Sequence, residues 1–167
     1  IVAVGGREGT IELWDAATLT RVGTVEAHAD AVEALAYSPD GTRLASASRD
    51  TTIRLWNSAT WEPVGPPLEG HEGAVAAIAF SPDGARLASG GWDGSVLLWD
   101  AAAGRVLGLP LRAHNDRVNG VAFRPDGLAV AAASSDGGAS MWDVSLAAWR
   151  ARACTVANRD LTETERA

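Results

Sequence analysis

Three histidines and a series of aspartates are the side chains with the greatest potential for chemistry in this chain. The histidines recur at intervals of 43 residues, at His28, His71 and His114, and each precedes a turn that carries an aspartate, at Asp50, Asp93 and Asp136. Histidine and carboxylate groups are common metal ligands, and with the serines near these turns they also resemble a catalytic Asp-His-Ser arrangement on paper. Both interpretations require the side chains of one site to converge.

The spacing of other residues shows that these positions belong to a repeat. Four tryptophans lie 42, 43 and 43 residues apart, at Trp14, Trp56, Trp99 and Trp142, and Pro-Asp-Gly returns at 39–41, 82–84 and 125–127. Residues at one register of successive repeats lie on a ring, whereas a metal needs its ligands within about 2–2.5 Å of one ion. We therefore expect no metal site. The chain also lacks a G-x-S-x-G motif, a phosphate-binding glycine loop and a cysteine pair, so we expect no cofactor and no catalytic residues.

Each period contains four short strand patterns separated by turns. In the period 71–113, "AVAAIAF" is followed by Pro-Asp-Gly, then "ARLASGG", the tight turn "WDG", "SVLLW" and a loop leading to "VLGLPL". Strands this close together pair as antiparallel hairpins, and apolar residues on both faces of 74–80 place each sheet between copies of itself. The sequence predicts an all-β fold, a β-propeller with blades of four antiparallel strands.

The ends of each period resemble those of the WD40 repeat. "EAH", "EGH" and "RAH" at 26–28, 69–71 and 112–114 match its first element, and "LWD", "LWN", "LWD" and "MWD" at 13–15, 55–57, 98–100 and 141–143 match its second. The resemblance covers residues 1–144. It implies a partial blade at 1–27 and blades at 28–70, 71–113 and 114–144, about four in all.

In that family a histidine, a hydroxyl, a turn aspartate and a tryptophan form a hydrogen-bonded structural network. The resemblance assigns these roles to His28, Ser48, Asp50 and Trp56 in one blade, and to His114, Ser134, Asp136 and Trp142 in the last. The third copy retains His71, Asp93 and Trp99, but Gly91 stands at the expected hydroxyl position. The first copy has Gly6 and Glu8 at the corresponding places. We expect weaker networks in these two copies.

Charge and composition limit the partners. A net charge of −7 argues against nucleic acid, because nucleic-acid binders carry a basic surface. There is no apolar run of membrane-spanning length, no signal peptide and only one cysteine, Cys154, so we expect a cytoplasmic protein without membrane contact.

The sequence after Asp143 departs from the repeat. Ser145 and the Ala- and Arg-rich residues beyond it predict a short helical tail over 145–167. This tail is similar to the ends of WD40 propellers in bacterial signalling proteins such as STAND-type ATPases and serine/threonine kinases. Because the first period lacks an innermost strand, we expect the remaining blades of a parent propeller, or a second copy, to complete the ring.

Residues that vary between repeats are the candidates for function. In the family, the face with the turn between the second and third strands binds most partners. On that face we predict partner contacts at Glu33, Arg49, Trp92, Arg117 and Asn119.

These positions favour a non-catalytic scaffold or sensor module that binds proteins or peptides within a larger bacterial signalling protein. The alternatives are a propeller that senses a ligand or peptide in its central channel, with Glu33 and Asn119 contributing, and an enzyme with its site on that channel. The enzyme is disfavoured because the innermost strands offer mostly alanine.

Overall fold

Four antiparallel sheets make up the described part of the protein, which is residues 1–112, 114–145 and 148 of a computed structural model. The first blade contains β1 (Val2–Gly5), β2 (Thr10–Trp14) and β3 (Arg21–Glu26). The second contains β4 (Val32–Tyr37), β5 (Arg43–Ser48) and β6 (Ile53–Asn57). The third contains β7 (Val75–Phe80), β8 (Arg86–Gly91), β9 (Ser95–Asp100), β10 (Arg105–Val106) and β11 (Leu111–Arg112). The fourth contains β12 (Val118–Phe123), β13 (Ala129–Ser134) and β14 (Ala139–Asp143).

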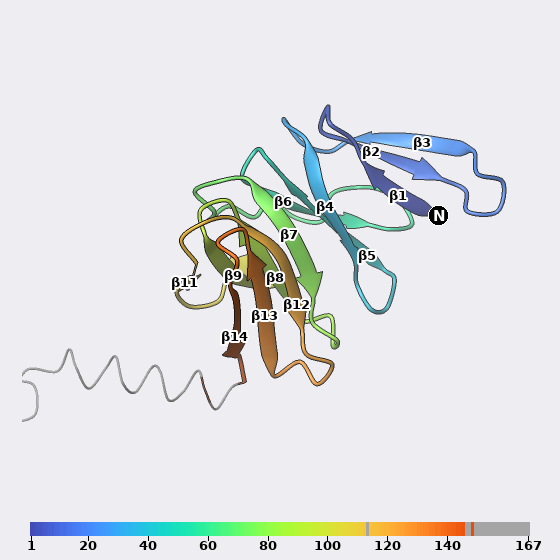
Figure 1. Cartoon of the computed structure of the whole chain (residues 1–167). Helices are drawn as coiled ribbons and strands as arrows, with labels where there is room; N and C mark the ends of the chain where they lie inside the picture. The colour runs from blue at the N-terminus through green and yellow to red at the C-terminus, as the bar shows by residue number, and fades with distance from the viewer. Residues whose placement is uncertain (113, 146–147, 149–167) are drawn as a thin grey trace, which may run out of the picture.

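The blades follow one another side by side, with β4, β7 and β12 as the innermost strands of the second to fourth blades (Figure 1). The predicted all-β fold of antiparallel propeller blades is confirmed. A fourth strand is present in the third blade as two segments, β10 and β11, which both pair with β9. In the second blade its place is marked by bridges from Ile53 to Leu68 and from Trp56 to Pro63.

The Pro-Asp-Gly turns have a local physical cause. Gly41 and Gly84 adopt φ angles of 70° and 68°, a region that side chains disfavour. The Asp40 carboxylate accepts the Ser38 hydroxyl at 2.6 Å and the Thr42 N–H at 3.0 Å, which closes the turn. The turn sequence therefore fixes where β4 ends and β5 begins.

A β-bulge interrupts the innermost strand of three blades at the same register. The pairing shifts between Val32 and Ala34, between Val75 and Ala77, and between Val118 and Gly120. The extra residues are Glu33, Ala76 and Asn119. A bulge redirects a side chain away from the regular alternation of a strand, and two of these three residues are polar.

The hydrophobic core lies between blades rather than within a single sheet. Ile11 and Leu13 pack against Leu44 and Trp56 between the first and second blades. Leu55 and Leu87 belong to the cluster between the second and third blades, and Leu98 and Val130 to the cluster between the third and fourth. Burial on both faces explains why the strands are nearly continuous apolar runs.

In the second and third blades, an arginine at the start of β5 or β8 links the blade to the next one. Arg43 donates from Nη1 to the Ala101 carbonyl at 2.8 Å and from Nη2 to the Gly84 carbonyl at 3.2 Å. Arg86 repeats this contact one blade further, to the carbonyls of Val144 at 2.9 Å and Gly127 at 2.7 Å. The guanidinium groups also lie over aromatic rings, Arg43 over Phe80 and Arg86 over Phe123. In the fourth blade the corresponding residue is Ala129.

The predicted helical tail over 145–167 falls outside the described residues, apart from Ser145 and Ala148. The Ala148 N–H donates to the Ser145 hydroxyl at 3.2 Å, the contact that a serine N-cap makes. In the part of the chain that the structure describes, no helix has the length and apolar character needed to cross a bilayer.

Candidate functional site

A buried hydrogen-bonded chain connects four side chains in the second blade. The His28 Nδ1 lies 2.9 Å from the Asp50 carboxylate, and its Nε2 lies 2.7 Å from the Ser46 hydroxyl. The Trp56 indole N–H donates to the same Ser46 oxygen at 2.8 Å. The assignment of Ser48 to this network is wrong: its hydroxyl donates to the Asp30 carbonyl and accepts the Asp50 N–H, so it braces the turn.

The third blade contains the complete network, which corrects the expectation that it would be weakened there. Ser89 supplies the hydroxyl, 2.7 Å from His71 Nε2 and 2.8 Å from Trp99 Nε1. His71 Nδ1 lies 3.0 Å from Asp93. Gly91 is not a missing hydroxyl, because a Cβ at this position would lie 2.5 Å from His71 Nδ1. The glycine makes room for the imidazole ring.

The incomplete network is in the fourth blade. His114 Nδ1 lies 3.1 Å from Asp136, but the residue in register with Ser46 and Ser89 is Ala132. His114 Nε2 is buried and has no hydrogen-bond partner among the described residues. Ser134 does not fill this role, because its hydroxyl donates to the Asp116 carbonyl at 3.2 Å. Trp142 packs edge-on against the His114 ring.

The first blade shows no such network within the described residues. The indole N–H of Trp14 donates instead to the Glu12 carboxylate at 3.1 Å. The turn position occupied by aspartate in the other blades is Glu8, and the residue two before it is Gly6.

One protonation state satisfies every member of the network in the second blade. Neutral His28 with its proton on Nδ1 donates to Asp50, and its Nε2 accepts the Ser46 O–H, whose oxygen accepts the Trp56 N–H. Burial lowers the pKa of His28, against the opposing charge of Asp50, which agrees with a neutral ring. Burial alone would raise the pKa of Asp50, but hydrogen bonds led by that from the Thr52 hydroxyl outweigh it and lower it to about 2.

The network has the composition of a catalytic triad but not its accessibility. Ser46 and Ser89 are completely buried, so no substrate can reach their hydroxyl oxygens. Across the residues that the structure describes, no three histidine, cysteine or carboxylate side chains are grouped closely enough to bind a metal. The geometry assigns these polar groups to the connection of strands within a blade.

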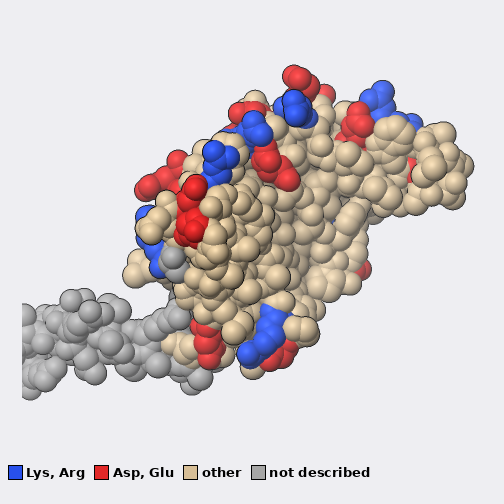
Figure 2. All heavy atoms as spheres, viewed as in Figure 1, with Lys and Arg blue, Asp and Glu red and all other residues tan. Residues whose placement is uncertain are grey.

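The varying residues lie along the edge of the blades where the innermost strands begin. The residue before each turn aspartate donates its backbone N–H to the start of the innermost strand: Arg49 to Ala31 at 3.0 Å, Trp92 to Ala74 at 2.8 Å and Ser135 to Arg117 at 3.0 Å. These bonds hold the turns against the inner strands. We call this edge the rim and define it by Glu33, Arg49, Trp92, Arg117 and Asn119. Figure 2 shows acidic and basic side chains along this upper edge, above a largely uncharged face.

Three of the predicted contact residues come together on the rim although they belong to three different blades. The Arg49 guanidinium of the second blade lies 5.3 Å from the centroid of the Trp92 ring in the third. The Arg117 guanidinium of the fourth blade lies 4.3 Å from the same ring. Both distances are within the range of cation–π attraction. Trp92 is 37% exposed, so the indole is held in place and remains accessible.

The other two predicted residues are the bulge residues, and each contacts a turn residue of its own blade. Glu33 forms an ion pair with Arg49 Nε, and the Asn119 amide donates to the Ser135 hydroxyl at 2.6 Å. The corresponding pair in the third blade is Ala76 and Trp92, where alanine offers no polar group. Trp92 is instead contacted by arginines from the neighbouring blades. Through its ion pair with Arg49, Glu33 lies next to the cation–π stack that Arg49 and Arg117 form on Trp92. Asn119 instead donates its hydrogen bond to Ser135.

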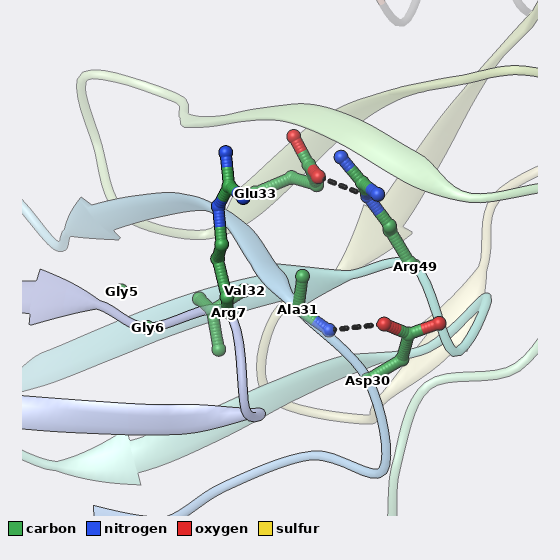
Figure 3. Close-up of a pocket in the computed structure, with 8 residues that line it drawn as sticks. All are labelled: Gly5, Gly6, Arg7, Asp30, Ala31, Val32, Glu33 and Arg49. Carbon is green, nitrogen blue, oxygen red and sulfur yellow. Dashed lines mark hydrogen bonds and ion pairs between the residues drawn. The ribbon is translucent and has the colours of Figure 1, made fainter.

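A cavity of about 490 Å³ opens at the rim between the first and second blades. Arg7, the residue before Glu8 in the first blade, is not among the predicted contact residues, but its side chain lines this cavity together with Gly5, Gly6, Asp30, Ala31, Val32, Glu33 and Arg49. Figure 3 shows Arg7 and Arg49 on opposite sides of Glu33. A second cavity of about 290 Å³ is lined by Ala3, Val4, Gly5, Val32, Glu33, Ala34 and Leu35, and Glu33 is the only ionisable residue among these.

Successive antiparallel blades that share cores with their neighbours define the class of β-propeller proteins. Within that class the chain belongs to the WD40 family: the family model described as WD domain, G-beta repeat matches residues 19–57, 61–100 and 105–143. Members of this family are generally non-catalytic scaffolds that bind other proteins.

Individual relatives match short parts of the chain. It is 42% identical over 55 residues to DDB1- and CUL4-associated factor 13 of Dictyostelium discoideum, a match covering 33% of this chain and 12% of that protein. It is 51% identical over 41 residues to a Notchless protein homolog of Arabidopsis thaliana, covering 25% of this chain and 9% of the relative. To eukaryotic translation initiation factor 3 subunit I of Culex quinquefasciatus it is 39% identical over 57 residues, covering 34% and 17%. The chain thus spans less than a fifth of each relative.

Proposed function

We propose that this chain is a non-catalytic protein-interaction module that docks its partner through the rim residues Glu33, Arg49, Trp92, Arg117 and Asn119. The observation that carries this proposal is the stack in which guanidinium groups from two blades lie 5.3 and 4.3 Å from the ring of Trp92 in the blade between them. Tryptophan and arginine are the residues most enriched among those that dominate binding energy at protein interfaces.

The stack is not required by the repeat. The scaffold positions recur from blade to blade, whereas the turn position of Trp92 is Arg49 in the second blade and Ser135 in the fourth. An indole that is 37% exposed in a turn adds little to the core, yet its two cation–π contacts and the adjoining Glu33 ion pair restrict its motion. Side chains ordered before binding lose less conformational entropy when a partner docks.

An enzymatic role has little support from the same residues. The cavity on the inner strands is lined by apolar residues and one carboxylate, Glu33, which already pairs with Arg49. General acid-base chemistry needs a second positioned group with a matched pKa. The sensing of a ligand in the channel would depend on the same carboxylate together with Asn119, whose amide already donates to the Ser135 hydroxyl.

The wider context of the module is part of the proposal. We extend it to a scaffold or sensor role within a larger bacterial signalling protein, located in the cytoplasm. The support is the similarity of the C-terminal tail to the tails of such proteins, and this tail falls outside the described residues. The relatives named above are eukaryotic proteins, and they support only the interaction role.

A capture experiment with matched variants tests the docking rim. The full chain, immobilised, captures partners from a lysate of its source, and each captured protein is quantified for wild type, Trp92→Ala and Arg117→Ala. Trp92→Ala should reduce capture of a specific partner by about tenfold or more, as expected for an interface hot spot. Tyr37→Ala is the matched control, since Tyr37 is 40% exposed and lies at the opposite end of a blade. Equal losses in the control and the rim variants would remove the assignment.

A further inference from the structure

The geometry points to an acidic peptide segment as the partner of the rim, with one carboxylate between Arg7 and Arg49 and a second at Arg117. This inference rests on the proposed docking function and names the chemistry of its partner. The three arginines belong to the first, second and fourth blades, so the segment would cross the blades along the rim.

Unused donor groups carry the inference. Arg49 pairs with Glu33 through Nε only, and its two terminal nitrogens make no hydrogen bond within the described residues. Arg7 and Arg117 have no ion pair among those residues, and both residues are exposed. A guanidinium presents parallel N–H groups that match the two oxygens of a carboxylate. The rim therefore offers three sets of oriented donors.

Most carboxylates on the same edge accept hydrogen bonds within the protein. Asp30 accepts the Ala31 N–H at 2.6 Å, and Asp116 accepts the Arg117 N–H at 2.7 Å. Of the turn carboxylates, Asp50, Asp93 and Asp136 each pair with a histidine, whereas Glu8 of the first blade has no ion pair among the described residues. Within the rim itself, Arg117 and the terminal nitrogens of Arg49 keep unused hydrogen-bonding capacity, whereas its one carboxylate, Glu33, is paired with Arg49.

The stack on Trp92 also selects against a cationic partner. The indole is already contacted by two guanidinium groups, at 4.3 and 5.3 Å from its centroid. A lysine or arginine of a partner would have to displace one of these groups or accept its repulsion. A carboxylate can bind the outer N–H groups of Arg49 and Arg117 while the stack holds them in position.

The charge of Glu33 predicts the direction in which peptide affinity should change when Glu33 is neutralised. Figure 3 shows its carboxylate between the side chains of Arg7 and Arg49, at the mouth of the cavity of about 490 Å³. An entering carboxylate must compete with Glu33 for Arg49. Neutralising Glu33 therefore strengthens the binding of an acidic segment and weakens the binding of a basic one.

A random twelve-residue peptide display library provides the probe. The library is first depleted on the Trp92→Ala variant of the full chain and then selected on the wild type, with thermal unfolding used to show that the variant is folded. Sequences retained by the wild type should contain Asp and Glu at about twice their frequency in the input or more, and fewer Lys and Arg.

Affinities of the selected peptides then test the charge directly. Replacing their Asp and Glu by Asn and Gln should weaken binding about fivefold, and Arg7→Gln or Arg117→Gln in the protein about threefold, as for partly exposed ion pairs. Glu33→Gln should tighten it. Arg105→Gln is the matched control, because Arg105 is exposed on the outer strand β10 and should leave affinity unchanged.

The outcomes separate this inference from the proposed docking function. Selected peptides that depend on Trp92 but are neutral or basic, or that bind equally well as amides, would overturn the acidic partner and leave the docking rim in place. The absence of any peptide enriched on the wild type over Trp92→Ala also counts against the acidic partner. The rim itself is decided by the capture experiment with Trp92→Ala and Tyr37→Ala.

Discussion

The broken network of the fourth blade should be repairable by one substitution, Ala132→Ser. Ala132 is 4% exposed and occupies the register of Ser46 and Ser89, which connect histidine and tryptophan in the two preceding blades. His114 Nε2 is buried without a partner among the described residues, and its side chain is 2% exposed. A hydroxyl at position 132 would donate to this nitrogen and accept the Trp142 indole N–H.

The magnitude follows from the hydrogen bonds that would form. An unsatisfied buried group costs about 1–3 kcal/mol, and a typical hydrogen bond contributes about 1 kcal/mol net, so Ala132→Ser should raise the free energy of unfolding by about 1–2 kcal/mol. For a chain of this size that corresponds to a rise of about 2–8 °C in Tm. Ser89→Ala removes the corresponding bonds in the third blade and should lower stability by about 1–3 kcal/mol.

Urea and thermal unfolding of the full chain at neutral pH, followed by circular dichroism, measure both changes. Ala88→Ser is the control, since Ala88 is completely buried on the other face of its strand next to Ser89. A hydroxyl at position 88 would face the apolar core instead of the histidine and tryptophan of the network, and should destabilise the protein. If Ala132→Ser is no more stable than the wild type, or behaves as Ala88→Ser does, the interpretation of His114 as an unsatisfied member of the network fails.

Three further predictions concern the connections between and within blades. Arg86→Leu removes the donors to the Gly127 and Val144 carbonyls and should lower stability by about 1–3 kcal/mol, with hydrogen exchange of β12–β14 accelerated more than that of β4–β6. Thr51 has a φ of 73°, a strained angle for a residue with a side chain, and the third blade has Gly94 with the same φ at the corresponding position. Thr51→Gly should therefore raise the free energy of unfolding by about 0.5–1 kcal/mol. A loss of stability in urea unfolding would contradict the presence of strain at Thr51. Acid should destabilise the second blade in two stages. Because the folded protein lowers the pKa of His28, the contribution of this residue to the free energy of unfolding is present above about pH 6.5 and is lost as the pH falls below that value. Because the pKa of Asp50 is lowered to about 2, its contribution is lost as the pH falls from 3.8 to 2. In Asp50→Ala the melting temperature at neutral pH should fall and the acid loss below pH 3.8 should shrink, which a pH series of melting curves checks.

The sequence alone determined the repeat and, through it, the fold. Strand-length apolar runs, Pro-Asp-Gly turns and a tryptophan every 42 or 43 residues each specify local backbone structure, and their recurrence shows that one unit packs against copies of itself. The comparison between repeats also separated scaffold residues from varying ones, since a position needed by every blade returns in every blade. This is why Trp99 could be assigned to the interior and Trp92 to the rim.

The position of the network hydroxyl could not be decided from the sequence pattern. Ser46 and Ser48 are two residues apart on β5, so their side chains leave the same face of the strand and the alternation of a strand does not distinguish them. Only the packed blade shows that Ser46 lies between the His28 ring and the Trp56 indole, whereas Ser48 lies at the strand end and braces the turn. The same two-residue displacement produced the errors at Gly91 and Ser134.

The tertiary structure also decided which varying residues lie in contact with one another. Arg49, Trp92 and Arg117 belong to separate blades, and no periodicity within a blade relates their side chains. Their contact depends on the packing of one sheet against the next and on the bulges that direct Glu33 and Asn119 away from the regular strand. Local sequence specifies each blade because strand and turn formation are short-range, while the rim is formed only when the buried faces of neighbouring blades bring distant turns together.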